Sequence, residues 1–163
     1  AKKIMGEEKA LSLANYASRD NARSVVQWSA EKNAGFTTAD EPWFVVNPNY
    51  KEINVEAAEK DPDSILNFYR ALIKFRKENE LVIYGDYKEH YKNSKDLYVY
   101  ERNYEGKRLL VVNSFSEKPV NFTAPAGFDL SKGRCALSNY KDPAVSNNGF
   151  TTKPYETRVY IFE

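Results

Sequence analysis

The chain has 163 residues, enough for one main domain with an appendage, because domains commonly contain about 100–150 residues. Its 24 Lys and Arg residues nearly balance 23 Asp and Glu residues, and a net charge of +1 gives no general attraction to nucleic acid or acidic membranes. We therefore expect neither nucleic acid nor membrane as a partner. Its hydrophobic residues are dispersed, without the run of about 20 that spans a bilayer, so we expect a soluble protein, and its single cysteine favours the reducing cytoplasm.

The first 50 residues have weak or irregular patterns. Residues 1–17 are charged and weakly helical and lack an initiator Met, so we interpret the chain as a fragment of a longer polypeptide. Residues 18–50 have the Asn, Asp, Gly, Thr and Pro content of a long loop. Aromatic residues such as Trp28 and Trp43 disfavour disorder there, because their burial favours packing. We expect a long, ordered loop with a functional role.

The strongest helix signal covers residues 61–77. Asp61 is suited to cap this helix and Pro62 to its first position, and basic residues gather near its C-terminal end. Five apolar residues recur at the spacing of one helix face: Ile65, Phe68, Tyr69, Leu72 and Ile73. We predict one amphipathic helix whose apolar face covers a neighbouring part of the protein.

After Glu80 the hydrophobic pattern changes to the two-residue period of strands. We predict strands over six segments: residues 81–87, 97–102, 108–115, 120–123, 134–138 and 157–162. Gly106, between the second and third of them, provides the positive φ that a hairpin turn needs. Short strands at this spacing indicate a mainly β fold class, an antiparallel Greek-key β-sandwich preceded by the irregular loop region and the helix.

The sequence lacks the usual motifs of catalysis, with no nucleophile elbow, phosphate-binding loop or dinucleotide fingerprint. A carboxylate pair for glycoside hydrolysis stays possible, but Asp and Glu are too common here to be specific. One cysteine, Cys135, and one histidine, His90, exclude an internal disulfide and leave too few ligands for zinc or iron. We interpret Cys135 as a small buried strand residue in a reducing compartment and His90 as part of a polar strand edge.

The densest polar segment is residues 18–28. Arg19 and Arg23 bracket the carboxylate of Asp20, an arrangement that supports a rigid loop with many hydrogen bonds. One interpretation is a loop anchor that clamps the N-terminal region to its neighbour. The other is a polar wall that faces a hydroxyl-rich ligand, with Trp28 beneath it. The residues by themselves leave both interpretations open.

Several short motifs follow one another in the first third of the chain. They are Arg19–Arg23, Gln27–Trp28, Asn33–Thr37, Pro42–Trp43, Asn47–Tyr50 and Ile53–Val55. In this order they resemble the end of the catalytic barrel in oligo-1,6-glucosidases and related α-glucosidases of the α-amylase superfamily, glycoside hydrolase family 13. The resemblance continues through Tyr84–Gly85 and ends with Pro154–Tyr160, so it covers nearly the whole chain.

This resemblance implies that the chain is the C-terminal portion of a larger enzyme. Residues 1–80 would be the remnant of a TIM barrel, and residues 81–163 a C-terminal β-sandwich domain. The parent would hydrolyse terminal α-linked glucose from isomalto- or malto-oligosaccharides with retention, using catalytic residues on earlier barrel strands. The missing N-terminal catalytic barrel of the same polypeptide would be the partner of this chain, which we predict to be inactive alone.

The resemblance also implies candidate substrate-binding residues that act only in the full enzyme. They are Arg23, Arg19, Asp20 and Trp28. Arg23 matches the arginine that helps hold the terminal glucose together with an aspartate from the missing part. Ser24–Val26 replaces the usual Thr-Pro-Met, and loss of the proline removes a fixed φ from this loop. We expect no catalytic residue, no metal ligand and no cofactor site within the chain.

Two alternative functions are weighed against this hypothesis. The chain could be an independent carbohydrate-binding module, because its strands are rich in tyrosines such as Tyr98, Tyr100 and Tyr104, and exposed, coplanar rings would suit sugar stacking. It could also be a complete enzyme, in which case the purified chain would release glucose from isomaltose. Proximity and oriented carboxylates supply most of the rate of such a reaction, so we expect no activity without them.

Overall fold

The computed structural model describes residues 6–17, 23–141 and 147–163. The chain divides into two compact units, Ala1–Asn67 and Phe68–Glu163, which are described here one at a time. Helix α4 (Ile65–Glu78) begins in the first unit and continues in the second. Within the described ranges, no helix combines the length and the hydropathy needed to cross a bilayer.

The N-terminal unit consists of short helices joined by irregular segments. They are α2 (Glu7–Ala17), the 3-10 turns η2 (Lys32–Gly35) and η3 (Pro48–Lys51), and α3 (Val55–Lys60). Asn54 caps α3, because its Oδ1 accepts a hydrogen bond from the backbone amide of Ala57 at 2.8 Å while its Nδ2 donates to the Tyr50 carbonyl at 2.9 Å. The weak helix predicted at the start of the chain corresponds to α2, whose described side chains are all at least partly exposed.

The predicted N-terminus of the amphipathic helix is wrong by three residues, because Ser64 rather than Asp61 caps it. The Ser64 hydroxyl accepts a hydrogen bond from the Asn67 amide at 3.2 Å and donates one to the Ala58 carbonyl at 2.6 Å. Asp61 instead accepts from the Asp63 amide at 2.9 Å, which closes a turn between α3 and α4. This local competition between short polar side chains moves Pro62 into the turn.

The apolar face predicted for this helix is largely uncovered in the structure. Ile65 is 88% exposed, and Tyr69 and Ile73 are also exposed. Phe75, which lies outside that face, packs instead against a core cluster of the C-terminal unit. The sequence predicts that this face covers another part of the protein, but the described residues do not cover it.

Residues 81–84, predicted as the start of a strand, form helix α5 (Glu80–Tyr84) instead. Leu81 is buried against Leu109 and Val159, so tertiary packing outweighs the β propensity of this run. Arg102 then fixes the exit from the helix, donating hydrogen bonds from Nε and Nη2 to the Gly85 carbonyl at 3.1 and 2.6 Å. The strand begins only at Asp86.

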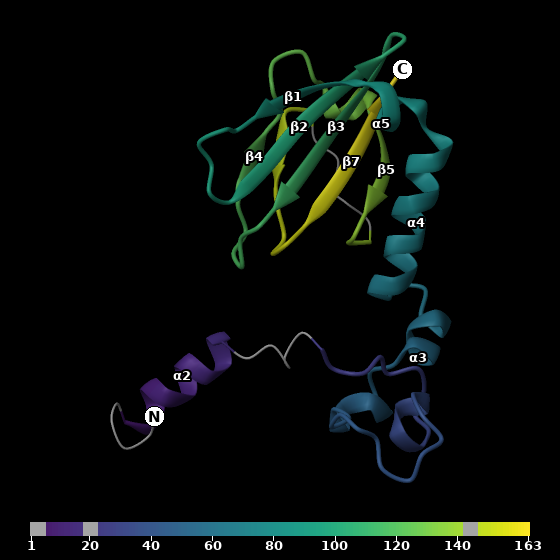
Figure 1. Ribbon diagram of the computed structural model, residues 1–163. Coiled ribbons are helices and arrows are strands. Elements are labelled where there is room, and N and C mark those ends of the chain that lie inside the picture. The colour runs from purple at the N-terminus through teal and green to yellow at the C-terminus, as the bar shows by residue number, and fades with distance from the viewer. Residues whose placement is uncertain (1–5, 18–22, 142–146) are drawn as a thin grey trace. The chain divides into compact units, whose positions relative to one another are not determined.

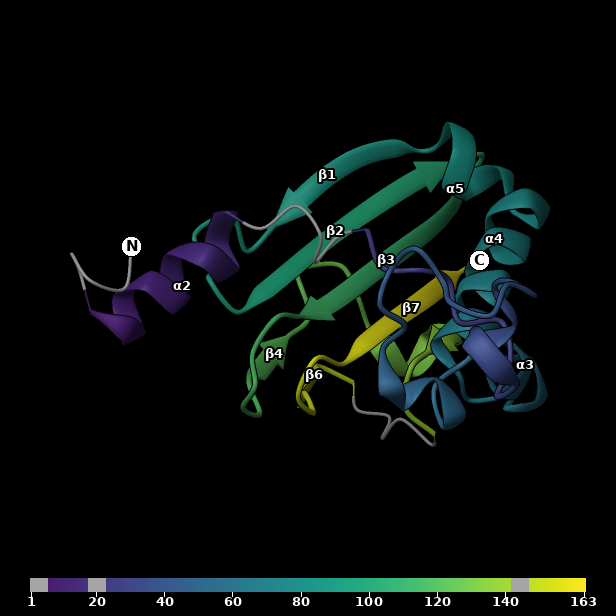
Figure 2. The same ribbon diagram turned by 60° about the horizontal axis from the view of Figure 1, so that its bottom comes forward.

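The C-terminal unit is an antiparallel β-sandwich, as predicted (Figures 1 and 2). Among the described residues, its larger sheet has the order β1 (Asp86–His90), β2 (Leu97–Tyr104), β3 (Lys107–Ser114), β7 (Thr157–Phe162) and β5 (Arg134–Ser138). A second pair joins β4 (Asn121–Thr123) to β6 (Gly149–Thr151). Strand β7 lies between β3 and β5, so the sheet neighbours are not consecutive in sequence, as Greek-key connections require.

The hairpin between β2 and β3 has the turn that the sequence predicts. Tyr104 pairs with Lys107, and Glu105 and Gly106 between them have φ values of 48° and 80°. Two successive positive φ values are typical of the type I′ turn, whose twist matches that of the strands. The hairpin therefore fixes the register of the two longest strands in the described part of the sheet.

Both faces of the larger sheet carry apolar clusters. The inner cluster, between the sheets, contains Leu97, Val99, Leu110, Val112, Phe122, Phe128, Leu130 and Tyr160. The outer cluster contains Leu81, Leu109, Val111, Val159 and Ile161, with Phe75 and Tyr100 packed against it. The alternation of strand side chains places neighbouring residues on opposite faces, so β3 and β7 contribute to both clusters.

Candidate functional site

The structure describes two of the four predicted substrate-binding residues. Arg23 is exposed in an extended segment, and Trp28, at its end, is 52% exposed. Arg19 and Asp20 lie outside the described residues. The pairing expected between Arg19, Asp20 and Arg23 therefore stays a prediction.

The segment that ends at Trp28 is anchored to the first turn of α3. The backbone amide of Val55 donates to the Gln27 carbonyl at 2.9 Å, and the amide of Glu56 donates to the Trp28 carbonyl at 3.0 Å. The Gln27 side-chain amide also donates to the carbonyl of Ile53. The first backbone amides of a helix have no acceptor within the helix. These contacts therefore give the first amides of α3 their acceptors, and they hold the backbone of Gln27 and Trp28 in place. This geometry matches the loop-anchor interpretation at that end of the segment.

A left-handed turn follows directly after Trp28. Asn33, Ala34 and Gly35 have φ values of 55°, 58° and 64°, and Ala34 is completely buried. The Ala34 carbonyl accepts from the amides of Trp28 and Ser29 at 2.8 and 3.1 Å, and Asn33 Nδ2 donates to the Ala39 carbonyl at 2.7 Å. A left-handed alanine costs about 1–2 kcal/mol, so these hydrogen bonds hold a strained turn beside Trp28.

The motif Asn33–Thr37 is recognised in the sequence, but as part of a long loop and not as a left-handed turn. The signal was present, because Asn and Gly are the residues that most readily adopt positive φ. It was hidden by Ala34 between them, which has no such preference. Phe36 follows the turn and is exposed, and it lines a surface pocket together with the half-buried Thr37 and the exposed Thr38.

The described part of the N-terminal unit around this segment has no hydrophobic core. Among residues 6–17 and 23–67, only Ala34 and Asn54 are buried, while Trp43 is 95% exposed. An open groove of about 400 Å³ is lined mainly by apolar side chains, including Val25, Val26, Ile53 and Leu66. Folded proteins seldom leave so much apolar surface in water unless it contacts a partner or a ligand.

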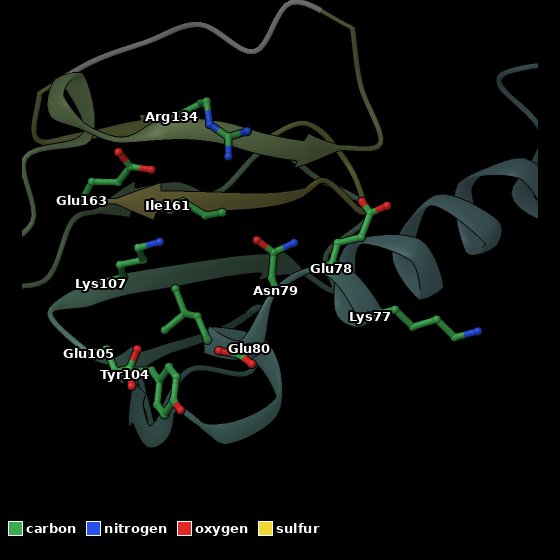
Figure 3. Close-up of a pocket in the computed structure, with 11 residues that line it drawn as sticks. Lys77, Glu78, Asn79, Glu80, Tyr104, Glu105, Lys107, Arg134, Ile161 and Glu163 are labelled. Carbon is green, nitrogen blue, oxygen red and sulfur yellow. The ribbon is translucent and has the colours of Figure 1, made fainter.

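One cavity of the sandwich has a lining of mixed charge. Its volume is about 470 Å³, and Figure 3 shows that its lining comes from the end of α4, the hairpin turn and the strands beyond it. Its charged residues are Glu78, Glu80, Glu105, Glu163, Lys77, Lys107 and Arg134. Positive and negative side chains are mixed around the cavity. Within the described ranges, no three potential ligands come close enough to hold a metal ion.

The surroundings of Cys135 and His90 indicate structural roles for both side chains. Cys135 lies in β5, where burial raises the pKa of its thiol, so the reactive thiolate is disfavoured. His90 ends the edge strand β1, as predicted, and its Nε2 lies 3.1 Å from Oε2 of the buried Glu101. The same carboxylate also contacts Arg108 at 3.4 Å, which makes it the centre of an ion network.

Three tyrosines gather on the outer face of the larger sheet. The Tyr100 ring lies 5.5 Å from that of Tyr87 and 5.4 Å from that of Tyr98. The hydroxyls of Tyr87 and Tyr98 are 2.9 Å apart, and this hydrogen bond is the main reason that the pKa of Tyr87 is raised to about 12. Tyr104, which the sequence analysis grouped with Tyr98 and Tyr100, pairs with Tyr84 instead at 5.9 Å.

Family models match both parts of the chain. Residues 1–85 match the alpha amylase catalytic domain, and residues 97–159 match the C-terminal domain of the alpha-amylase SusG. The first match covers more than half of the chain. The chain belongs to the α-amylase family. The resemblance identified in the short motifs of its first third is therefore confirmed.

Curated relatives of this α-amylase-family chain include oligo-1,6-glucosidases. It is 44% identical to an oligo-1,6-glucosidase of Halalkalibacterium halodurans and 41% identical to one of Parageobacillus thermoglucosidasius, with 88% and 89% of this chain aligned. The alignments cover 26% of each relative, so the chain spans about a quarter of their length.

Two solved structures have the same fold over these residues. A trehalose-6-phosphate hydrolase of Bacillus licheniformis superposes with a TM-score of 0.90 at 39% identity, covering 99% of this chain and 30% of that one. An isomaltulose synthase of Klebsiella sp. LX3 gives 0.79 at 36% identity, covering 88% and 26%. These neighbours support the sandwich and the preceding helical segments as family features.

Proposed function

We propose that this chain is the C-terminal part of a retaining α-glucosidase that acts on isomalto- or malto-oligosaccharides, and that its own role is structural. The observation that carries the proposal is that the segment around Gln27 and Trp28 is ordered, although the described residues around it form no hydrophobic core. Gln27 and Trp28 are held by backbone hydrogen bonds, yet the apolar side chains beside them are exposed. A catalytic barrel of the same polypeptide would cover that surface, and the quarter-length match to the curated relatives leaves room for one.

Within the full enzyme, Arg23 would contact the substrate. It precedes the anchored pair Gln27 and Trp28 by only a few residues, and its exposed guanidinium offers five donors suited to sugar hydroxyls. Arg19, Asp20 and Trp28 would complete this side of the binding site. The two interpretations of the segment then apply to different parts of it, an anchor at Gln27 and Trp28 and a ligand contact at Arg23.

The proposed division of labour places residues 1–80 in the barrel and residues 81–163 in the sandwich domain. The first family match ends at residue 85 and the second begins at residue 97, which supports a boundary near this position. The compact units divide earlier, within α4, because Phe75 packs against the outer cluster of the sandwich. A cytoplasmic location is part of the proposal and is supported by the thiol of Cys135, which has no disulfide partner in the sequence.

A first experiment tests the inactivity of the chain. The purified chain is incubated with isomaltose, maltose and trehalose 6-phosphate, and free glucose is measured. Trehalose 6-phosphate is included because the Bacillus licheniformis neighbour is a trehalose-6-phosphate hydrolase. We expect no release above the buffer blank, since proximity and oriented carboxylates supply most of the rate. Turnover of any of the three substrates would contradict the structural role.

A second experiment restores the missing part. The catalytic barrel of the Halalkalibacterium halodurans enzyme is joined to this chain, which replaces the matching quarter of that enzyme. We expect the chimera to release glucose from isomaltose. Arg23→Ala should lower kcat/KM by about 10- to 100-fold, the loss of a charged hydrogen bond worth about 1.5–3 kcal/mol.

Lys51→Ala is the matched control for Arg23→Ala, because Lys51 is also an exposed cation of the N-terminal unit. It should leave kcat/KM within about twofold of the chimera, as surface substitutions usually do. An inactive chimera that is folded by circular dichroism would count against the proposed parent. An active chimera in which Arg23→Ala and Lys51→Ala behave alike would remove Arg23 from the site.

A further inference from the structure

We propose that the outer face of the sandwich carries a second carbohydrate site, built on Tyr87, Tyr98 and Tyr100, which binds short α-linked glucans without hydrolysing them. The site is separate from the substrate contact proposed for Arg23. It also requires no residue of the catalytic barrel, because all its members belong to the C-terminal unit.

The tyrosines form a supported aromatic surface. Tyr100 is partly buried against the outer cluster, so its ring is held in place from below. Tyr87 and Tyr98 flank it and are 52% and 37% exposed. Binding of a ligand to these rings should cost little side-chain entropy. A Tyr side chain has only two rotatable angles, and contacts between the rings already restrict them. Such rings offer apolar faces to the C–H groups of a sugar.

The hydroxyls of this surface are placed for a polyhydroxyl ligand. In the 2.9 Å contact between Tyr87 and Tyr98, either phenol can donate. When Tyr87 donates, Tyr98 keeps its proton for an outside acceptor; when Tyr98 donates, the Tyr87 proton is directed to the Glu89 carboxylate. The Glu89 carboxylate lies 3.5 Å from the Tyr87 hydroxyl and adds acceptor oxygens at the edge of the surface. A sugar hydroxyl can both donate and accept, so it matches donors and acceptors that lie this close together.

A row of neutral polar side chains continues from Tyr98 across the sheet. Tyr98 pairs with Asn113, and Asn113 pairs with Thr157 on the next strand. Asn113 Nδ2 donates to the Tyr98 carbonyl at 3.3 Å, and its Oδ1 accepts from the Thr157 hydroxyl at 3.1 Å. With neighbouring strands about 4.8 Å apart, the strip from β1 to β7 is about 14 Å wide, which suits an oligosaccharide better than a monosaccharide.

The charges of this strip favour a neutral ligand. Arg102 faces the same side of β2, but its guanidinium is already held by the Gly85 carbonyl. The strip therefore presents aromatic rings, hydroxyls, amides and, at its edge, the Glu89 carboxylate, rather than the clustered cations that a phosphate or a nucleic acid needs. The carbohydrate chemistry of the α-amylase family then selects glucans among neutral polyhydroxyl ligands.

The test is titration of the 163-residue chain with isomaltotriose and maltotriose, by calorimetry and by amide chemical shifts. We expect saturable binding with a Kd of about 1 mM for at least one trisaccharide. Tyr98→Ala should weaken it at least about tenfold, and Tyr87→Ala should do the same. Circular dichroism and urea unfolding verify that each variant is folded.

The matched control is Tyr84→Ala. Tyr84 is likewise exposed and likewise packs on a second tyrosine, Tyr104. Tyr104 lies six residues from Tyr98 along β2, about 20 Å at 3.3 Å per residue. The Kd should therefore stay within about twofold in this variant. Equal weakening by Tyr84→Ala and Tyr98→Ala would overturn the site, as would no saturation up to about 20 mM sugar.

Sedimentation separates the sugar site from a protein contact. If the wild-type chain self-associates and Tyr98→Ala abolishes the association without any sugar binding being seen, the face is an interface between copies and the proposal fails. The result is independent of the catalytic proposal, because binding is measured on a chain expected to release no glucose. Failure of the chimera would leave the sugar titration unaffected.

Discussion

Arg158 Nε donates a hydrogen bond to Oε1 of Glu156 over 2.8 Å, and both side chains are almost completely buried. The other carboxylate oxygen, Oε2, accepts from the Lys153 amide at 2.7 Å. The guanidinium also stacks 3.6 Å from the centre of the Phe150 ring. The Glu156 carboxylate thus contacts the loop before β7, and the Arg158 guanidinium contacts β6. Together the two side chains link this loop to the smaller sheet.

Glu156→Gln should strongly destabilise the sandwich. It retains the side-chain shape but removes the carboxylate charge that pairs with the buried Arg158 guanidinium, a change that costs about 3–5 kcal/mol. Urea unfolding followed by far-ultraviolet circular dichroism measures it. Glu105→Gln, in the exposed hairpin turn, is the control and should change the free energy of unfolding by less than about 0.5 kcal/mol. Equal effects of the two substitutions would show that the buried pair is not important.

Acid should weaken the sandwich through Glu101. Burial alone would raise the pKa of this carboxyl, but the hydrogen bond from His90 and the charges of Lys88, His90 and Arg108 outweigh it and lower the pKa. A folded-state pKa below the unfolded value means that the contribution is complete above about pH 4.3 and is lost as the pH falls through the folded pKa. The free energy of unfolding, measured from about pH 7 to about pH 3, should therefore fall less steeply in Glu101→Gln than in the wild type. Parallel curves would contradict this role.

Two glycines of the sandwich should differ in their tolerance of a side chain. Gly106 has a φ of 80°, and a Cβ added there would meet only open space, so Gly106→Ala should cost only the backbone strain, about 1–2 kcal/mol. Gly149 has a φ of 149°, and a Cβ there would collide with the Phe122 carbonyl in the paired strand. Gly149→Ala should therefore cost more than Gly106→Ala. Urea unfolding of the two variants gives the order, and the reverse order would refute the steric argument.

Local chemistry explains which parts of the fold the sequence predicts. The β2–β3 hairpin is predicted correctly because Gly106 adopts the positive φ of the turn readily, whatever surrounds it. Helix α5 is predicted wrongly because Leu-Val-Ile-Tyr has the pattern of a strand, and only the burial of Leu81 against β3 and β7 selects the helix. The start of α4 is misplaced because Asp61 and Ser64 can both cap, and the choice depends on contacts with α3.

The candidate sites, too, are only partly predictable from the sequence. The motifs around Arg23 and Trp28 are visible in the sequence because their order is a linear property. The tyrosine cluster is only partly visible, since Tyr98 and Tyr100 share a strand but Tyr87 joins them through the register of β1 with β2. Tyr104 shares the alternation of Tyr98 and Tyr100, yet its ring lies beside Tyr84. Sequence patterns give the face of a strand and not the neighbours across it.

The hydroxyl contact between Tyr87 and Tyr98 gives a prediction at high pH. It raises the pKa of Tyr87 to about 12, with smaller effects of desolvation and of the Glu89 charge in the same direction. Because the folded-state pKa lies above the unfolded value of about 10, the contact stabilises the fold below about pH 10, and its contribution is lost as the pH rises through the folded pKa. Absorbance of phenolate during an alkaline titration should therefore show one exposed tyrosine that ionises late. Tyr98→Phe removes the partner hydroxyl and should return that tyrosine to about pH 10, whereas Tyr84→Phe should leave it unchanged. If Tyr98→Phe leaves the late ionisation in place, the two hydroxyls are not paired, and the arrangement on which the proposed sugar site depends is wrong.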